Sequence, residues 1–261
     1  MTRRIFCVAL VALVLVWVPV AADEIKVVTS GAFTAAYQEL VPAFERASGH
    51  TVTTAFGGSM GSAPDAIPNR LERGEHFDVV ILASTALDAL IANRKVVAGS
   101  RVDLVRSIIG LAVRAGAPKP DISSVDAFRR AMMQAKSVAV STSASGVYVS
   151  NELFPRLGIA AAMKSKIRIV DSGPVGAAVA RGDAELGFQQ MSELQPVPGI
   201  DIVGPLPKDI QRVTIFSAGI VADSAVSMAA RALVDFLASP AAFAAMRSSG
   251  LEPVAVPAGK R

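Results

Sequence analysis

The sequence predicts an α/β protein of two lobes, each a mostly parallel sheet covered by helices, with a ligand cleft between the lobes. Strand-like and helix-like segments alternate from residue 24 to residue 189, as in sheets whose parallel strands are joined by helices. Residues 77–82 are apolar on both faces apart from Asp78, which is typical of a strand buried between helices. No low-complexity linker interrupts the pattern, so we expect the lobes to be joined by crossing strands.

The first part of the chain begins with a predicted strand at residues 24–29 and a helix at residues 35–47. In that helix Tyr37, Leu40 and Phe44 recur at the spacing of one helical face, and Gly49 is expected to end it. The next predicted elements are strands at residues 51–56 and 77–82 and a helix at residues 84–93.

The remaining elements divide the chain into the two lobes. We predict strands at residues 107–113, 137–141, 166–171, 185–189 and 212–222. Helices are expected at residues 123–134, 146–154, 174–181, 224–237 and 240–248. The segments near residues 104–108 and 211–219 are the candidate crossings. We therefore assign residues 23–106 plus 212–261 to lobe 1 and residues 107–211 to lobe 2.

The N-terminus has the pattern of a signal peptide. Arg3 and Arg4 precede an apolar run of about 14 residues, and small residues ending at Ala22 follow. The alternative is a membrane anchor, but the run is shorter than the ~20 residues that span a bilayer. We expect residues 1–22 to be removed near Ala22, the mature protein to reside in the periplasm, and no stable membrane anchor to remain.

Charge and cysteine content exclude several classes of protein. Cys7, the single cysteine, lies inside the predicted signal peptide, so we expect neither a disulfide framework nor a thiolate site. The chain has 26 Lys and Arg against 22 Asp and Glu, and two of the arginines lie in the signal peptide. No basic block stands out, so nucleic acid is not an expected partner.

Motifs for metal, nucleotide or serine-hydrolase chemistry are missing from the sequence. His50 and His76 have no metal-ligand spacing to each other, and there is no G-x-S-x-G motif. The loop at residues 57–61, GGSMG, lacks the Lys-Ser/Thr ending of a phosphate-binding P-loop. We therefore expect no metal and no cofactor.

Three small polar loops are the candidate binding elements. Residues 29–33 (TSGAF), 57–62 (GGSMGS) and 141–148 (STSASGVY) each follow a predicted strand and lead into a predicted helix. Ligands of open α/β sheets bind at the carboxyl ends of strands, where backbone N–H groups and serine hydroxyls attract anions. Each loop alone could be an ordinary turn with a helix cap, but three together favour an anion site.

These motifs resemble a known family over nearly all of the mature chain. TSGAF, FGGSMGS with RLERGEHFDVVILAS, and GPVGAAVARGDAELGF are similar to segments of the periplasmic substrate-binding proteins of ABC transporters. These have type II lobes, and the likeness is greatest to the molybdate-binding branch. The resemblance implies ligand contacts by position at Ser30, Ser59, Ser145 and Val175. Within the same loops we expect further contacts at Gly31, Gly58, Met60 and Gly146.

The sequence departs from the molybdate-binding branch where ligand identity is decided. That branch usually has a ligand-contacting tyrosine where this chain has Gln190, and Gln189 adds a second amide. Amides suit a carboxylate, and Arg106, near a predicted crossing, could clamp one. We therefore expect the capture of a di- or tricarboxylate for uptake by an ABC permease, by a protein that we expect to be a monomer.

Two alternatives stay open. The chain also resembles the bacterial aconitate isomerases, which implies an enzyme that interconverts cis- and trans-aconitate by allylic proton transfer. Such an enzyme needs a base within about 3 Å of the proton that it removes, and the candidates are Tyr148, Glu193 and His76. The other alternative is binding of molybdate or tungstate.

Overall fold

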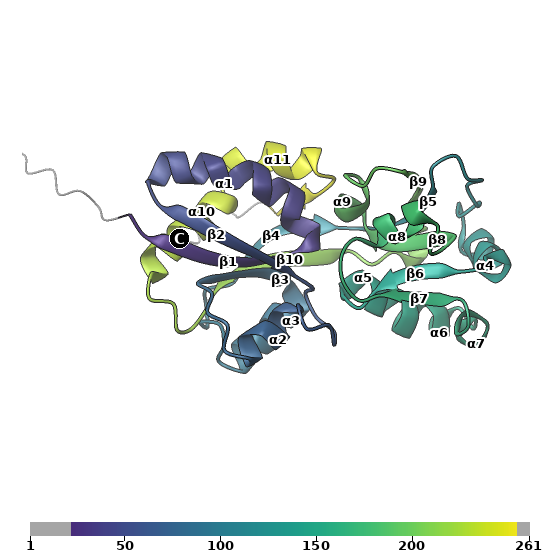
Figure 1. Ribbon diagram of the computed structural model, residues 1–261, viewed down its shortest axis with the longest axis horizontal. Helices are drawn as coiled ribbons and strands as arrows, with labels where there is room; N and C mark the ends of the chain where they lie inside the picture. Colours follow the sequence, from purple (N-terminus) through teal and green to yellow (C-terminus); the bar gives the residue numbers. More distant parts are fainter. Residues whose placement is uncertain (1–21, 255–261) are drawn as a thin grey trace, which may run out of the picture.

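The computed structural model describes residues 22–254, so the predicted signal peptide, apart from Ala22, lies outside the described residues. The chain forms two lobes that lie end to end along the long axis of the molecule (Figure 1). We call the lobe that contains β1–β4, β10 and β11 the first lobe, and the lobe that contains β5–β9 the second lobe. The two-lobed α/β fold predicted from the sequence is confirmed.

The sheet of the first lobe has six strands in the order β11-β4-β10-β3-β1-β2. Strand β1 pairs in parallel with β2 and β3, whereas β10 runs antiparallel to β3 and β4, and β11 antiparallel to β4. The strands are β1 (Glu24–Ser30), β2 (Thr51–Gly57), β3 (Val79–Ala83), β4 (Val102–Ser107), β10 (Thr214–Ile220) and β11 (Glu252–Pro253).

Helices cover both faces of this sheet, because alternate residues of its central strands are apolar on opposite sides. One face of β3, with Val79 and Ile81, packs against helices α1, α10 and α11. The other face, with Val80 and Leu82, packs against α2 and α3. The bounds of these helices are α1 (Thr34–Ser48), α2 (Ile67–Glu72), α3 (Ser84–Ala92), α10 (Ser227–Leu237) and α11 (Phe243–Ser248), with a 3₁₀ turn η4 (Pro240–Ala242) before α11.

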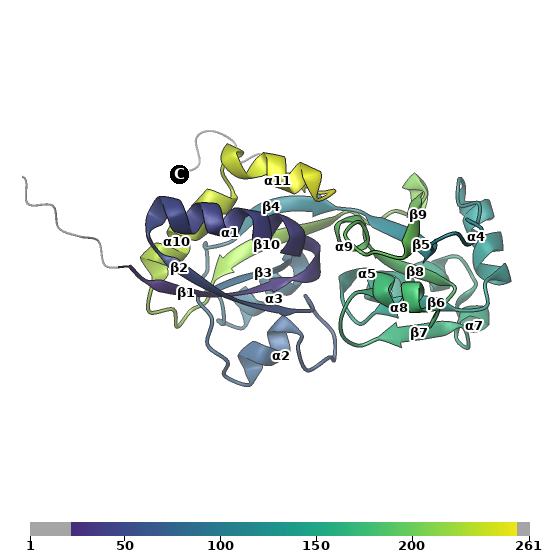
Figure 2. The same ribbon diagram turned by 45° about the horizontal axis from the view of Figure 1, so that its top comes forward.

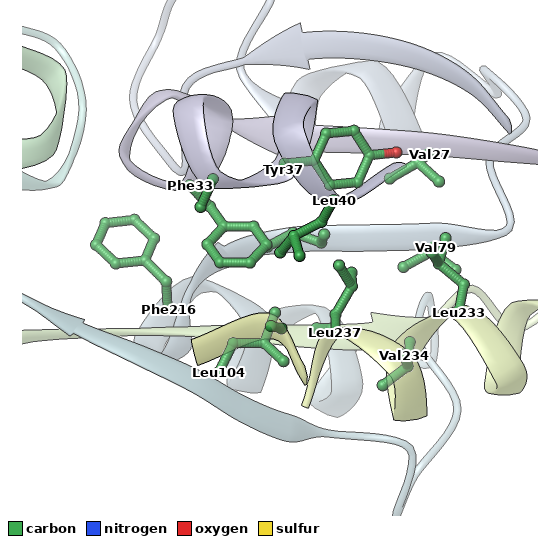
Figure 3. Close-up of a cluster of buried hydrophobic side chains, with 14 of the residues drawn as sticks. Val27, Phe33, Tyr37, Leu40, Val79, Leu104, Phe216, Leu233, Val234 and Leu237 are labelled. Carbon is green, nitrogen blue, oxygen red and sulfur yellow. The ribbon is translucent and has the colours of Figure 1, made fainter. Parts of the chain in front are cut away.

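The larger of these two cores contains the aromatic side chains at the start of α1. Figure 3 shows Phe33 beside Phe216 of the sheet, with Tyr37 farther along α1 and Leu237 of α10 in the same core. Phe33 belongs to the 3₁₀ turn η1 (Gly31–Phe33), which leads directly into α1. As predicted, α1 ends at Gly49, which has the left-handed φ of 78°. This packing fixes the turn that follows β1.

The second lobe has a five-stranded sheet in the order β7-β6-β8-β5-β9. Strand β6 is parallel to β7 and β8, while β5 is antiparallel to β8 and β9. The strands are β5 (Ile109–Arg114), β6 (Val138–Ser141), β7 (Ile167–Val170), β8 (Leu186–Gln190) and β9 (Ile200–Pro205). The helices are α4 (Val125–Gln134), α5 (Ala144–Tyr148), α6 (Phe154–Arg156), α7 (Ala160–Met163), α8 (Val175–Arg181) and α9 (Met191–Leu194).

Two crossing segments join the lobes (Figure 2). The first is the continuous run from β4 through Ile108 into β5, and the second returns from β9 to β10. Gln211 ties the two together, since its side-chain oxygen accepts from the N–H of Ile109 at 2.9 Å and its side-chain nitrogen donates to the carbonyl of Ile109 at 2.9 Å. The lobe boundaries at residues 106 and 212 stay a prediction.

Three features differ from the sequence-based expectations. The sheets are mixed rather than mostly parallel, because the strands next to the crossings reverse direction. Strand β9, helices α7 and α9 and strand β11 were not predicted; the two helices have four residues each and β11 has two, whereas β9 has six. The helix expected at residues 146–154 begins earlier, at Ala144, and continues through a π-helical turn η2 (Val149–Leu153) into α6.

Within residues 22–254 no single helix is long and apolar enough to cross a membrane. The segments Ser227–Leu237 and Pro240–Ser248 together have the necessary length and composition, but they are bent by 57°. Their buried residues, including Leu233 and Met246, pack in the core of the first lobe.

Candidate functional site

A cleft of about 600 Å³ lies between the lobes. Its walls include the carboxyl ends of β1, β2, β6 and β8, where open α/β sheets bind their ligands. All three loops singled out from the sequence contribute residues to it, among them Ser30, Ser59 and Ser145. Among the described residues, no lysine, arginine or histidine lines the cleft, so its polar contacts come from hydroxyls, amides, backbone groups and carboxylates.

The first loop presents a serine that has no hydrogen-bond partner. Ser30 is 1% exposed, and its hydroxyl group forms no hydrogen bond with any of the described residues. It follows β1 and precedes the turn η1 that opens α1. A buried hydroxyl without a partner costs about 1–3 kcal/mol, so a ligand that accepts from Ser30 would relieve that cost.

The second and third loops contact each other across the cleft. The side chain of Ser59 accepts from the N–H of Ala83 at 3.0 Å, and the N–H of Ser59 donates to the hydroxyl of Ser143 at 3.0 Å. Because the hydroxyl of Ser59 acts as acceptor in the first contact, its hydrogen stays available to a ligand. Ser145 is buried beside Ser143 in the third loop and also lines the cleft.

Two glutamines at the end of β8 line the cleft from the second lobe. The side-chain oxygen of Gln189 accepts from the N–H of Val175 at 2.8 Å, and its side-chain nitrogen donates to Glu193 Oε1 at 2.9 Å. The side chain of Gln190 donates to the hydroxyl of Thr214 at 3.3 Å, and its buried oxygen has no partner among the described residues. Both glutamines line the cleft.

Glu193 is the carboxylate with the most altered environment in the cleft. It lies on the short helix α9, at the junction of the two lobes (Figure 1). Burial raises the pKa of Glu193 from its ordinary value of 4.5 to about 7, although hydrogen bonds from the Gln189 side chain and the Gln190 backbone favour the ionised form. A carboxyl group with a pKa near neutrality can both accept and return a proton.

The lobes touch each other at more than one place beside the cleft. The hydroxyl of Ser192, beside Glu193, donates to the carbonyl of Ala32 in the first lobe at 2.8 Å. Glycine is required at Gly61, which has a φ of +102° and where a Cβ would overlap the carbonyl oxygen of Thr142, and a Cβ at Gly31 would overlap Glu193 Oε1 and displace that side chain. The two lobes are therefore in direct contact next to the cleft.

Several residues predicted as ligand contacts lie outside the cleft lining. Arg106 is 45% exposed on β4 and pairs with Glu252 at 3.6 Å, because its side chain points to the β11 edge of the sheet. Met60 packs against the core of the first lobe instead. Val175 is fully buried and reaches the site only through its backbone N–H, and Gly146 packs tightly against the backbone of Ser141. None of these four residues lines the cleft, and the ligand contacts expected at Val175 and Gly146 stay a prediction.

Two of the three candidate bases are also excluded by their positions. His76 is 82% exposed and lies near Asp223 at 3.5 Å, on the surface of the first lobe. The hydroxyl of Tyr148 donates to the carbonyl of Ile210 at 2.8 Å, and the guanidinium of Arg212 lies 4.4 Å from the centre of its ring. Neither residue lines the cleft, which leaves Glu193 from that set.

The structure also adds residues that sequence reasoning missed. Ser143, Ser192, Asp65 and Asp171 line the cleft. Ser143 belongs to the third predicted loop, and Asp171 ends the strand expected at residues 166–171. Both positions therefore could have been identified from the predicted strand ends. Ser192 belongs to α9, a helix of four residues that is too short for a periodic signal. Within the described residues, no group of three or more His, Cys, Asp or Glu side chains could hold a metal ion.

Comparisons with known sequences find relatives over most of the chain. A family model described as bacterial extracellular solute-binding protein matches residues 25–252. An aconitate isomerase from a Pseudomonas species is 48% identical over 258 residues, which cover 97% of this chain and 98% of that protein. A molybdate-binding protein from Azotobacter vinelandii is 29% identical over 245 residues, covering 88% and 90% of the two chains.

Solved structures share the fold. The periplasmic molybdate-binding protein of Azotobacter vinelandii superposes with a TM-score of 0.70 at 20% identity, covering 87% of this chain and 98% of that chain. The sulfate-binding protein of Mycobacterium tuberculosis also has a TM-score of 0.70, at 17% identity, with 89% and 87% of the chains covered.

Proposed function

Because the chain belongs to the family of bacterial extracellular solute-binding proteins, we propose that its cleft binds a small unsaturated polycarboxylate and isomerises it by moving one proton. The observation that carries this proposal is Glu193, a carboxyl group with a pKa of about 7 in the wall of the cleft between the lobes. The 48% identity to an aconitate isomerase supports aconitate as the substrate.

The chemistry needs one group that acts first as a base and then as an acid. Ionised Glu193 takes a proton from the CH₂ carbon of cis-aconitate, and the electron pair of that C–H bond spreads over the adjacent C=C bond and the terminal carboxylates. Protonated Glu193 then returns the proton to the CH carbon of the original double bond, so the double bond moves by one position. No electron is gained or lost, and no co-reactant is needed.

The product is again an aconitate because both ends of the three-carbon unit carry a carboxylate. The new double bond forms from what was a single bond, so its cis or trans geometry follows the conformation in which the cleft holds the substrate. Rotation about an existing double bond is never required. A closed cleft that fixes this conformation would therefore decide which isomer forms.

Neutral donors would hold the substrate and the charge that develops on it. We propose Ser30, Gly31, Gly58, Ser59, Ser145 and Gln190 as ligand contacts, whereas the amide of Gln189 is already bonded to Val175 and Glu193. Hydroxyls and amides that are already oriented stabilise a developing enolate-like carboxylate without reorganising during the reaction. The unpartnered hydroxyl of Ser30 and the donor hydrogen of Ser59 support this role.

The decisive experiment is incubation of the purified mature protein with cis-aconitate in D₂O, followed by ¹H NMR. We expect trans-aconitate to appear. The product should carry deuterium to the extent that the proton on the Glu193 carboxyl group exchanges with D₂O before it is returned. Glu193→Gln should lower the rate by at least about 100-fold, the order of a general acid–base contribution. Glu72→Gln, an exposed glutamate on α2, is the matched control. A wild-type protein that forms no trans-aconitate above background would refute the proposal.

The second candidate function is capture of a polycarboxylate for uptake by an ABC transporter. Membership of the solute-binding family favours it, and it would entail export to the periplasm through residues 1–22, a monomeric protein and a permease partner. A thermal-shift panel of tricarboxylates, molybdate and tungstate separates the alternatives. Stabilisation by a tricarboxylate without turnover would favour capture, and stabilisation by molybdate or tungstate alone would favour an oxyanion carrier.

A further inference from the structure

We propose that Gln189 is the positioning residue for Glu193, holding the carboxyl group of the base in one orientation. This inference rests on the proposed function for its catalytic consequence, but the contact itself is independent of turnover. Gln189 ends β8 and Glu193 lies four residues later on α9, and the side-chain nitrogen of Gln189 donates to Glu193 Oε1 at 2.9 Å.

The orientation of the Gln189 amide is set by a second partner. Its oxygen accepts from the N–H of Val175 at 2.8 Å. Val175 is the first residue of α8, where a backbone N–H has no acceptor within the helix. With the oxygen held there, the NH₂ end of the amide faces Glu193. Gln189 is 4% exposed, so turning the amide around would leave two buried donors facing each other.

The first lobe restricts Glu193 from the other side. Glu193 Oε1 lies against Gly31, where any side chain would overlap it, and the neighbouring Ser192 bonds to Ala32. The carboxyl group is thus enclosed between an amide of the second lobe and the backbone of the first. A base in proton transfer must stay within hydrogen-bond reach of one carbon and then of another, and this enclosure provides that constraint.

The charges around Glu193 leave Gln189 as the principal donor. The other ionisable groups that line the cleft among the described residues are Asp65 and Asp171, both acidic. The elements packed against α9 are η1, α1, α8, β5 and β8. None of the charged side chains on these elements lines the cleft. These side chains are Glu39, Glu45, Arg46, Arg114 and Arg181. The hydrogen bond from Gln189 therefore supports the ionised form of Glu193 where no cation does so.

The test replaces the amide with a side chain of similar size that cannot donate. In Gln189→Met, the titration midpoint of Glu193, followed by ¹³C NMR of glutamate-labelled protein, should move upward by about one pH unit. The resonance is assigned by its loss in Glu193→Gln. Turnover of cis-aconitate should lose at least about tenfold in kcat while KM changes less than about threefold, and the acid limb of kcat/KM should move upward with the midpoint.

Gln134→Met, at an exposed site at the end of α4, is the matched control and should match the wild type in every readout. If Gln189→Met does not fold, the same measurements are made on Gln189→Asn, whose side chain is too short to bridge Val175 and Glu193. An unchanged Glu193 midpoint would overturn the positioning role even if the wild type turns over. A shifted midpoint in a protein without isomerase activity would instead uphold the contact and refute the proposed function.

Discussion

Glu193 should make the protein less stable as the pH rises, and its removal should stabilise the fold. Burial raises the pKa of Glu193 from 4.5 to about 7 in the folded protein, so the folded state binds this proton more tightly than the unfolded state does. Below about pH 4.5 the carboxyl group is protonated in both states, and its contribution to stability is fully present. Between about pH 4.5 and 7 the unfolded state loses the proton first, and that contribution is lost.

The size of the effect follows from the shift. A rise from 4.5 to about 7 corresponds to about 3 kcal/mol at about 1.36 kcal/mol per pH unit. We expect about 2 kcal/mol, because the side chain keeps part of its surface open to the cleft and solvent screens it there. Glu193→Gln, which cannot ionise, should therefore gain about 2 kcal/mol in free energy of unfolding relative to the wild type at about pH 8.

The assay is urea unfolding of the wild type, Glu193→Gln and the exposed-site control Glu72→Gln at about pH 4.5 and about pH 8. Between these two pH values the wild type and the control should lose the same amount of free energy of unfolding. Glu193→Gln should lose about 2 kcal/mol less free energy of unfolding than the wild type over the same range. If all three proteins show the same pH dependence, Glu193 is not a buried carboxyl group with a raised pKa, and the argument for a base in the cleft fails with it.

Three further substitutions test the cleft and the core. Gly31→Ala should displace the carboxyl group of Glu193, because the new Cβ would overlap Glu193 Oε1, and turnover of cis-aconitate should fall; unchanged turnover would contradict this role of the contact. Ser59→Ala should weaken binding of tricarboxylate by about 1–3 kcal/mol in calorimetry, since the N–H of Ala83 and the ligand both lose a partner; unchanged affinity would remove Ser59 from the site. Phe33→Ala should cost about 3–5 kcal/mol in urea unfolding, because its fully buried ring fills the core beside α1, and a loss below about 1 kcal/mol would contradict that packing.

The sequence by itself determined the elements whose signals are local. The apolar run at residues 77–82 predicted a buried strand, the spacing of Tyr37, Leu40 and Phe44 predicted α1, and Gly49 predicted its end. The glycine- and serine-rich loops were found in the same way, since a turn between a strand and a helix has a characteristic composition. Because parallel strands carry such loops to one edge of a sheet, the cleft wall could be anticipated as well.

Only the tertiary structure decided which side chains reach the cleft. Arg106 and His76 stood near plausible positions, yet one points to an outer sheet edge and the other to solvent. Glu193 was one of three candidate bases in the sequence, and its raised pKa arises from burial where the two lobes meet beside Gly31, although the hydrogen bond from Gln189 acts in the opposite direction. The physical reason is that burial depends on contacts between segments about 160 residues apart, and local composition carries no information about how two lobes close on each other.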